Sequence, residues 1–418
     1  MPPYAAQRSA SRRPASIYRV PEHIKKMTNR GVYEPQLVSL GPFHHEKAEL
    51  RRMEAHKHRA VEHLVKRSGK SREEFKASVE KIAEQLRGSY EGLDEEKWSG
   101  EEFVEMMVTD GCFLLEIMRT FQIEGKMRVD YEPDDPVFSE HGYLYLRCDI
   151  ISDVLVLENQ VPLLLLQTLS DVAVSNNLIQ ITNKSVLSFL FSTPDAPDNV
   201  TLDNHHLGLH PLDVVQKSIR GVSKEWKGKA GVFSIPCAAE LHEAGIKFKA
   251  NDEDGVGFAE ACSFKSGVLT IQNLYVMDST ECLYLNLMAF ERLHTGAGND
   301  VMALVLFMDN IIDTAKDVAL LRSKGIIGNL FSSDEAVAEL FNGLSKGAVM
   351  SPSSSLYGVQ QQVNAHCNKR WNRWRASLMH TYFRNPWVFI SLIAAFILLA
   401  GTVMQTVYTI MSFYTRAN

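Results

Sequence analysis

The last stretch of the chain, Trp387–Tyr408, constrains the fold most, because no charged residue lies between Arg384 and Arg416. A helix over these 22 residues would be about 33 Å long, which is enough to cross a hydrocarbon core of about 30 Å. We therefore predict a membrane anchor over residues 387–411 and a short tail over residues 412–418. The anchor side chains expected to face lipid or headgroups are Trp387, Phe389, Leu392, Phe396, Leu399 and Tyr408.

The basic residues around this stretch lie almost entirely on its N-terminal side, and only Arg416 follows it. Because short basic flanks stay in the cytosol, this asymmetry predicts a single-pass protein of the plasma membrane or an endomembrane with a cytosolic body. Ser391 and Ala395 are small residues four positions apart, so two spans could associate there as a homo-oligomer. The basic residues before the anchor are Lys369, Arg370, Arg373, Arg375 and Arg384.

Charge is divided unevenly along the chain. Residues 340–418 contain seven basic residues and no acidic one, so residues 1–339 carry a net charge of −13 out of a total of −6. An acidic body argues against a nucleic-acid partner, whereas a basic segment beside the anchor predicts contact with anionic membrane lipid. The protein partner that a membrane-held body would bind is not identified by the sequence.

Hydrophobic periodicity predicts a mainly α fold. Apolar residues recur at three-and-four spacing over Glu46–Lys66, Ser71–Tyr90 and Glu101–Gln122. The pattern changes over about residues 245–277, where short alternating runs separated by turn residues predict a small antiparallel β meander. Two further β-type runs within residues 17–44 predict a small strand pair.

These patterns divide the chain into segments. Residues 1–16 are rich in Ser, Arg and Pro and are expected to form a disordered basic arm, and residues 17–350 form the mostly helical body. Residues 351–386 are expected to comprise a Ser-rich linker and a juxtamembrane basic helix. We expect that helix to run from Tyr357 to Asn385 and to continue through Pro386 into the anchor.

Two groups of polar residues interrupt apolar stretches and are candidate site residues. Asp110 falls on the apolar stripe of Glu101–Gln122, where it could be a general base with a raised pKa, or pair with a buried Arg or a backbone amide. Glu158, Asn159 and Gln160 precede Pro162 at a predicted break between two helices. They could bind a ligand, with Glu158 as a second candidate catalytic carboxylate, or satisfy the helix ends that the break exposes.

The sequence carries no intact catalytic motif. Gly343–Gly347 fits the GxSxG pattern of a hydrolase, but a helical pattern precedes it and no acidic residue follows Glu339. The histidines near residues 44–63 are interleaved with Lys and Arg, which would oppose a divalent cation. We therefore predict no metal and no cofactor, and we assign no catalytic residue beyond the two candidate carboxylates.

Six short motifs stand out along the chain, and they are Tyr33-Glu-Pro-Gln-Leu-Val-Ser-Leu-Gly-Pro-Phe-His44, Asp110-Gly-Cys-Phe-Leu-Leu-Glu116, Leu157-Glu-Asn-Gln-Val-Pro162, Ala244-Gly-Ile-Lys-Phe248, Asn286-Leu-Met-Ala-Phe-Glu291 and Asn385-Pro-Trp387. In this order, over about residues 17–411, the chain resembles the plant family catalogued as domain of unknown function 247. The resemblance implies a plant protein, mostly membrane-associated through a C-terminal span, with no established enzymatic activity. It also implies a possible link to pollen–pistil self-recognition, to which some relatives in grasses are linked.

Three hypotheses about function remain open at this point. The first is a tail-anchored interaction, recognition or signalling protein without catalytic activity. The second is an enzyme that acts on a small or lipid-derived substrate through a buried carboxylate. The third is a recognition ectodomain with the body outside the cytosol, in which the sequons at Asn183 and Asn199 would carry glycans.

Overall fold

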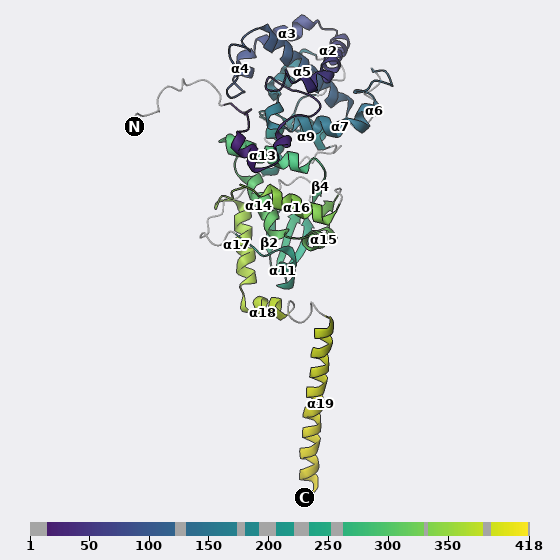
Figure 1. Ribbon diagram of the computed structural model, residues 1–418, viewed down its shortest axis with the longest axis vertical. Coiled ribbons are helices and arrows are strands. Elements are labelled where there is room, and N and C mark those ends of the chain that lie inside the picture. Colours follow the sequence, from purple (N-terminus) through teal and green to yellow (C-terminus); the bar gives the residue numbers. More distant parts are fainter. Residues whose placement is uncertain are drawn as a thin grey trace, which may run out of the picture.

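The computed structural model describes residues 15–121, 131–173, 180–191, 206–220, 234–251, 262–329, 333–378 and 386–416. Figure 1 shows an elongated body with helices α2 to α5 at one end and the small strands nearer the other end. Helix α19 extends from that second end, away from the body. The prediction of a mainly α fold is confirmed.

Helix α5 (Glu101–Thr120) is the centre of the helical end of the body. Glu101 and Glu102 lie in its first turn, where carboxylates stabilise the partial positive charge of a helix N-terminus. Every residue from Met106 to Thr120 is buried, because α2 (Glu54–Ser68), α3 (Arg72–Glu80) and α8 (Leu163–Val172) all pack against this helix. The polar residues within Met106–Thr120 therefore have no solvent-facing side and need partners within the protein.

The other helices of this end are short and follow one another closely. They are α1 (Glu22–Met27), η1 (Arg30–Tyr33), η2 (Ala48–Met53), α4 (Ala83–Arg87), α6 (Glu140–Tyr145), α7 (Arg147–Val154), η4 (Leu157–Asn159), α9 (Asn183–Phe191) and α10 (Pro211–Arg220). The predicted break before Pro162 is confirmed, since η4 ends at Asn159 and α8 begins at Leu163.

The second half of the body packs around α14 (Asp300–Ile311), which contacts α10 as well as its own neighbours. The buried apolar side chains form one contiguous hydrophobic core, with members from Ile17 to Val363. Both halves of the body therefore share this core. The neighbours of α14 and the helices beyond them are α11 (Ala238–Glu243), α13 (Thr280–Leu293), α15 (Ala315–Ser323), α16 (Asp334–Leu344) and α17 (Ser355–Cys367).

The predicted meander is correct in one of its pairings. Strands β2 (Ser263–Lys265) and β3 (Val268–Gln272) are antiparallel and joined by Ser266 and Gly267, whose φ values of 50° and 82° suit a tight hairpin. Strand β1 (Lys247–Asn251) lies on the other side of β3 and runs parallel to it, so a simple meander is wrong. A separate parallel pair joins β4 (Leu274–Val276) to β5 (Ile327–Asn329), from a distant part of the chain.

The strand pair predicted within residues 17–44 is wrong. Two stretches of this segment are helical, and Ile17 forms an isolated bridge with Tyr90. The segment Gln36–Gly41 lies in no strand, and Gln36, Leu37 and Gly41 are bends. Its backbone bonds to buried side chains instead of to a neighbouring strand, as described below.

The helix predicted to run from Tyr357 into the anchor is interrupted. Helix α17 ends at Cys367 and α18 (Arg370–Leu378) begins after Asn368 and Lys369. The Asn372 side chain donates to the His366 carbonyl at 2.8 Å, which also accepts the Lys369 N–H at 3.2 Å, so α18 is attached to the end of α17. Residues 379–385, and with them Arg384, lie outside the described residues.

Helix α19 (Pro386–Arg416) contains the apolar stretch. Within it, Ile393–Ser412 is the one helix of the described chain that is long and apolar enough to cross a membrane, by length and composition. Phe396, Leu399 and Tyr408 are 72%, 64% and 68% exposed. The side chains of Trp387, Phe389 and Leu392 lie outside the described set, as do residues 1–14 of the predicted arm.

Candidate functional site

The irregular segment Gln36–Gly41 is held by side chains from three other parts of the chain. Asp153, near the end of α7, accepts the backbone N–H of Gln36 at 2.8 Å with Oδ1. Its Oδ2 accepts the N–H groups of Leu37 and Val38, each at 2.7 Å. One carboxylate thereby satisfies three consecutive backbone donors, which a partner strand could not do because strand donors alternate in direction.

Asn159 continues this pattern along the same segment. Its Oδ1 accepts the Leu40 N–H at 2.7 Å, and its Nδ2 donates to the Val38 carbonyl at 3.0 Å. Nδ2 also donates to the carbonyl of Asp153 at 3.0 Å. Because Asn159 is fully buried, these bonds replace the water contacts that its carboxamide loses on folding.

Asp110 of α5 reaches the end of the segment. Its Oδ2 accepts the Gly41 N–H at 2.8 Å, and its Oδ1 accepts from Lys57 Nζ at 2.7 Å. The same ammonium donates to Ser39 Oγ at 3.2 Å and lies 2.7 Å from Glu54 Oε1. The sequence left Asp110 as either a general base or a residue paired with a buried Arg or a backbone amide. In the structure, Asp110 pairs with a buried cation and with a backbone amide. The cation is Lys57 rather than the expected arginine.

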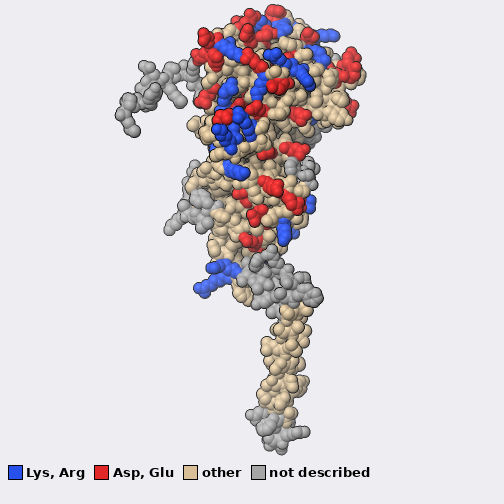
Figure 2. All heavy atoms as spheres, in the orientation of Figure 1, with Lys and Arg blue, Asp and Glu red and all other residues tan. Residues whose placement is uncertain are grey.

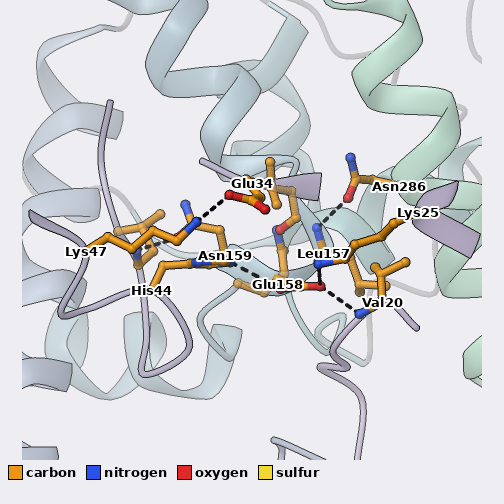
Figure 3. Close-up of polar contacts among 12 residues, drawn as sticks. Val20, Lys25, Glu34, His44, Lys47, Leu157, Glu158, Asn159 and Asn286 are labelled. Atoms are coloured by element: carbon orange, nitrogen blue, oxygen red, sulfur yellow. Dashed lines mark hydrogen bonds and ion pairs between the residues drawn. The ribbon is translucent and has the colours of Figure 1, made fainter. Parts of the chain in front are cut away.

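Glu158 binds the chain further toward its N-terminus (Figure 3). Its Oε1 accepts the Val20 N–H at 2.8 Å and lies 2.7 Å from Lys25 Nζ, while Oε2 lies 3.4 Å from His44 Nε2. Burial acts to raise the pKa of Glu158, but the bonds from His44, Lys25 and Val20 outweigh it and the pKa is lowered. Glu158 is therefore held ionised.

Gln160 secures the break between η4 and α8. Its Nε2 donates to the carbonyls of Val154 and Val156 at 2.5 and 2.8 Å, and its Oε1 accepts the Leu212 N–H at 3.1 Å. The carboxamide thus satisfies the last carbonyl of α7, the carbonyl of Val156 just before η4 and a donor in the first turn of α10. This matches the expectation that these residues serve exposed helix ends, and it joins three helices at one side chain.

Sequence reasoning missed two members of this arrangement. Asn286 of α13 accepts the Leu157 N–H at 2.9 Å and donates to the Val32 carbonyl at 2.7 Å (Figure 3). Asp153 was also missed. Each is a polar residue within an apolar helical pattern, the same signal that singled out Asp110. We call Asp110, Asp153, Glu158, Asn159, Gln160 and Asn286 the polar network.

The polar network leaves little capacity for acid–base chemistry. Burial raises the pKa of Asp110, with Lys57 acting in the opposite direction, and burial raises the pKa of Asp153 to about 6. A raised pKa suits a general base, but such a base needs a free lone pair directed at its substrate. The oxygens of Asp110 each accept a bond from the protein, and its side chain is 1% exposed.

A surface pocket of about 410 Å³ adjoins the network at His44. Arg19, Lys47, Lys97 and Trp98 also line it. Its two lysines are already paired, Lys47 with Glu34 and Lys97 with Glu46, each at 2.6 Å. Its charges are therefore largely balanced before any ligand arrives. Among the described residues, no group of three or more His, Cys, Asp or Glu is arranged to hold a metal ion.

Comparison with known proteins adds four findings. A plant protein family of unknown function, DUF247, matches residues 17–401. A UPF0481 protein of Arabidopsis thaliana is 30% identical, over 97% of this chain and 88% of its own length. A second, putative UPF0481 protein of Arabidopsis thaliana is 27% identical over 44% of this chain and 35% of its own length. No solved structure matches.

Proposed function

The chain belongs to the plant protein family of unknown function DUF247, and from that premise we propose a non-catalytic interaction protein held at a membrane by α19. The body faces the cytosol and binds another protein. The observation that carries this proposal is the complete exposure of the apolar stretch Ile393–Ser412, of which no part is buried against the body. Leaving so much apolar surface in water is unfavourable, and a hydrocarbon environment removes that cost.

The charge of the flanking residues supports the orientation. Lys369, Arg370, Arg373 and Arg375 precede α19, and Arg416 is its last residue. Basic residues close to the end of a span favour the cytosolic side. In Figure 2, α19 carries no charged side chain along the part that is coloured, whereas both signs are dense over the body.

The polar network supports the absence of catalysis. Asp110 and Glu158 accept hydrogen bonds from the backbone and from buried cations of the same chain. Because the two side chains are only 1% and 2% exposed, a substrate could reach neither carboxylate without displacing the residues packed around it. The same contacts explain why these residues are buried at all, since a buried charge without a partner is strongly unfavourable.

The Asn183 sequon offers no support to the ectodomain alternative. Asn183 is 7% exposed, and its carboxamide donates to the His206 carbonyl at 3.0 Å and accepts the Gly208 N–H at 2.8 Å. A glycan on that nitrogen would require these contacts to break. Asn199 lies outside the described residues, so glycosylation there is the more useful probe of topology.

Membrane retention of the full chain tests the role of α19. The wild-type chain, expressed in plant cells, is expected to stay with membranes after alkaline carbonate extraction. The double variant Leu399→Arg/Val403→Arg places two charges in mid-span, at a cost of about 3 kcal/mol each, and is expected to become extractable. Leu144→Arg/Tyr145→Arg, at exposed positions of α6, is the matched control and should stay on membranes. Extraction of the wild type, or retention of the mid-span variant, would contradict the proposal.

A further inference from the structure

Helix α18 turns two tryptophans and several cations away from the body. Trp371 and Trp374 are 70% and 58% exposed, and their ring centroids lie 5.4 Å apart. Lys369, Arg370 and Arg373 are exposed beside them. Figure 2 shows basic residues at the end of the body next to α19. Exposed tryptophans of this kind are unusual on a surface that contacts only water.

The flank of α18 that carries Asn372 and Arg375 is fixed to the body. Asn372 donates to the His366 carbonyl at 2.8 Å, and at about 100° per residue it lies about 160° around the helix from Trp374. Helix α18 also contacts α11 and α17. The Arg375 guanidinium lies against Gly245, at a point where an ideal Cβ would be 2.2 Å from its Nη1. The tryptophan face therefore has a set direction relative to the body.

We propose that α18 is an interfacial helix that lies flat on an anionic bilayer surface, a proposal that rests on the proposed function. Trp371 and Trp374 enter the headgroup layer, and Lys369, Arg370 and Arg373 pair with lipid phosphates and carboxylates. Indole rings favour the headgroup depth because they combine a large apolar surface with one N–H donor. Lipid-facing helices of this type carry aromatic residues beside Lys and Arg.

Two further observations favour lipid as the occupant of this surface. The anchor helix begins at Pro386, only eight residues beyond the end of α18 at Leu378, so an inserted α19 brings α18 to the bilayer surface. No acidic residue follows Glu339, so nothing in this part of the sequence opposes anionic lipid. Figure 1 draws α18 across the long axis of the molecule, between the body and α19.

The proposal has a consequence for the body. Because α18 is attached to α11 and α17, a helix docked flat on the surface fixes the orientation of the whole body. The end that carries α2, α3 and α4 then points away from the membrane (Figure 1). A partner in the cytosol would meet that end first.

Hydrogen exchange of the full chain in nanodiscs tests the proposal. The α18 amides are compared in discs of phosphatidylcholine alone and in discs that also contain phosphatidylserine. We expect slower exchange of α18 with phosphatidylserine. The exchange rates give an equilibrium constant for binding of α18 to the lipid surface. In the double variant Arg370→Gln/Arg373→Gln this constant should fall about 30-fold, since each cation near an anionic surface strengthens binding about fivefold. Trp371→Ala/Trp374→Ala should weaken protection in both kinds of disc.

The matched control removes two positive charges at the far end of the body. Lys66 and Lys81 are exposed, and Lys66→Gln/Lys81→Gln should leave α18 exchange unchanged. Equal exchange in both lipids, with the chain inserted in the discs, would overturn the interfacial helix and leave the proposed function standing. It would favour a protein partner for the tryptophans, which are common at protein interfaces. A chain that fails to enter the discs would contradict both proposals.

Discussion

The side-chain oxygen of Asn159 accepts the backbone N–H of Leu40 at 2.7 Å, although 119 residues separate the two in sequence. With Asp153 and Asp110, it gives the irregular segment Gln36–Gly41 hydrogen bonds for backbone groups that no neighbouring strand pairs. The segment contacts α5, α7 and η4 through these bonds. The polar network therefore attaches an N-terminal, non-helical segment of the chain to the helical core.

Replacement of Asn159 should reveal how much this attachment contributes to stability. Asn159→Ala leaves the Leu40 N–H and the Val38 carbonyl buried without partners, and each such group costs about 1–3 kcal/mol. We expect the free energy of unfolding to fall by about 3 kcal/mol, measured by urea denaturation of the full chain in nanodiscs.

Asn364→Ala is the matched control for this measurement. The Asn364 carboxamide donates one exposed bond to the Ser234 carbonyl at 2.9 Å. Its loss should cost about 1 kcal/mol or less, because water can replace an exposed partner. Equal losses in the two variants would show that the Asn159 contacts add nothing beyond an ordinary surface bond.

Asp110→Asn tests whether that carboxylate is structural. The change leaves Lys57 buried beside a neutral side chain, with Glu54 as its remaining anionic partner at 2.7 Å. We expect the free energy of unfolding to fall by about 3 kcal/mol. This is near the lower end of the cost of breaking a buried ion pair, because Glu54 still pairs with Lys57. The double variant Asp110→Leu/Lys57→Met removes both charges and should recover part of this loss. An Asp110→Asn protein as stable as the wild type would instead favour the enzyme hypothesis.

Gly41→Ala should be far more damaging than the same change at another left-handed glycine. Gly41 has φ 72°, and an added Cβ would lie 2.8 Å from the Tyr90 hydroxyl and 2.9 Å from the Gln160 carbonyl. Gly92 has φ 66° but open space around it. Gly92→Ala should therefore cost only the backbone strain of about 1–2 kcal/mol. We expect Gly41→Ala to lower the midpoint of thermal unfolding well beyond Gly92→Ala, and similar midpoints would contradict the close approach.

His210 should make stability depend on pH. Its Nε2 lies 3.0 Å from the Ser16 carbonyl and its Nδ1 accepts the Asp213 N–H at 3.3 Å, an arrangement that requires the neutral ring. Burial lowers the pKa of His210 to about 4, against about 6.5 in an unfolded chain. As the pH falls, His210 is therefore protonated in the unfolded chain before it is protonated in the folded chain. The contribution of His210 to the free energy of unfolding is fully present above pH 6.5 and declines by about 3 kcal/mol as the pH falls to 4.

A comparison with His210→Gln isolates this effect. Asp153 acts with the opposite sign, since its raised pKa of about 6 makes its contribution decrease as the pH rises through the same range. The wild-type profile therefore contains both effects. The difference between the wild type and His210→Gln should grow with pH between 4 and 6.5. A difference that does not change with pH would contradict a buried neutral ring, and exposed His242→Gln serves as the control.

Much of the helical framework could be predicted from the sequence because it depends on local signals. The break before Pro162 and the buried position of Asp110 are examples, since each shows as an irregularity within an apolar pattern. The partners of Asp110 and Asn159 could not be predicted, because they depend on which backbone groups the tertiary fold brings near. Nothing in Gln36–Gly41 distinguishes a run that pairs with a strand from one that bonds to side chains.

The strand order illustrates a second limit. Alternation predicted short strands within about residues 245–277, and Lys247–Asn251 and Val268–Gln272 lie there, but their parallel pairing depends on the route of the chain between them. Likewise, the helical pattern gave no sign of the interruption between α17 and α18, where Asn372 donates to the His366 carbonyl. Local propensity predicts the elements, and tertiary contacts decide their arrangement.

Protease treatment of sealed membrane vesicles carrying the full chain, with their cytosolic face outward, tests the central claim most directly. That claim is a body on the cytosolic face, held there by α19. The account predicts that added protease digests the body before any detergent is present, while a small fragment containing Ile393–Ser412 remains protected. A body that stays intact until detergent opens the vesicles would place it on the other side of the membrane and contradict the account.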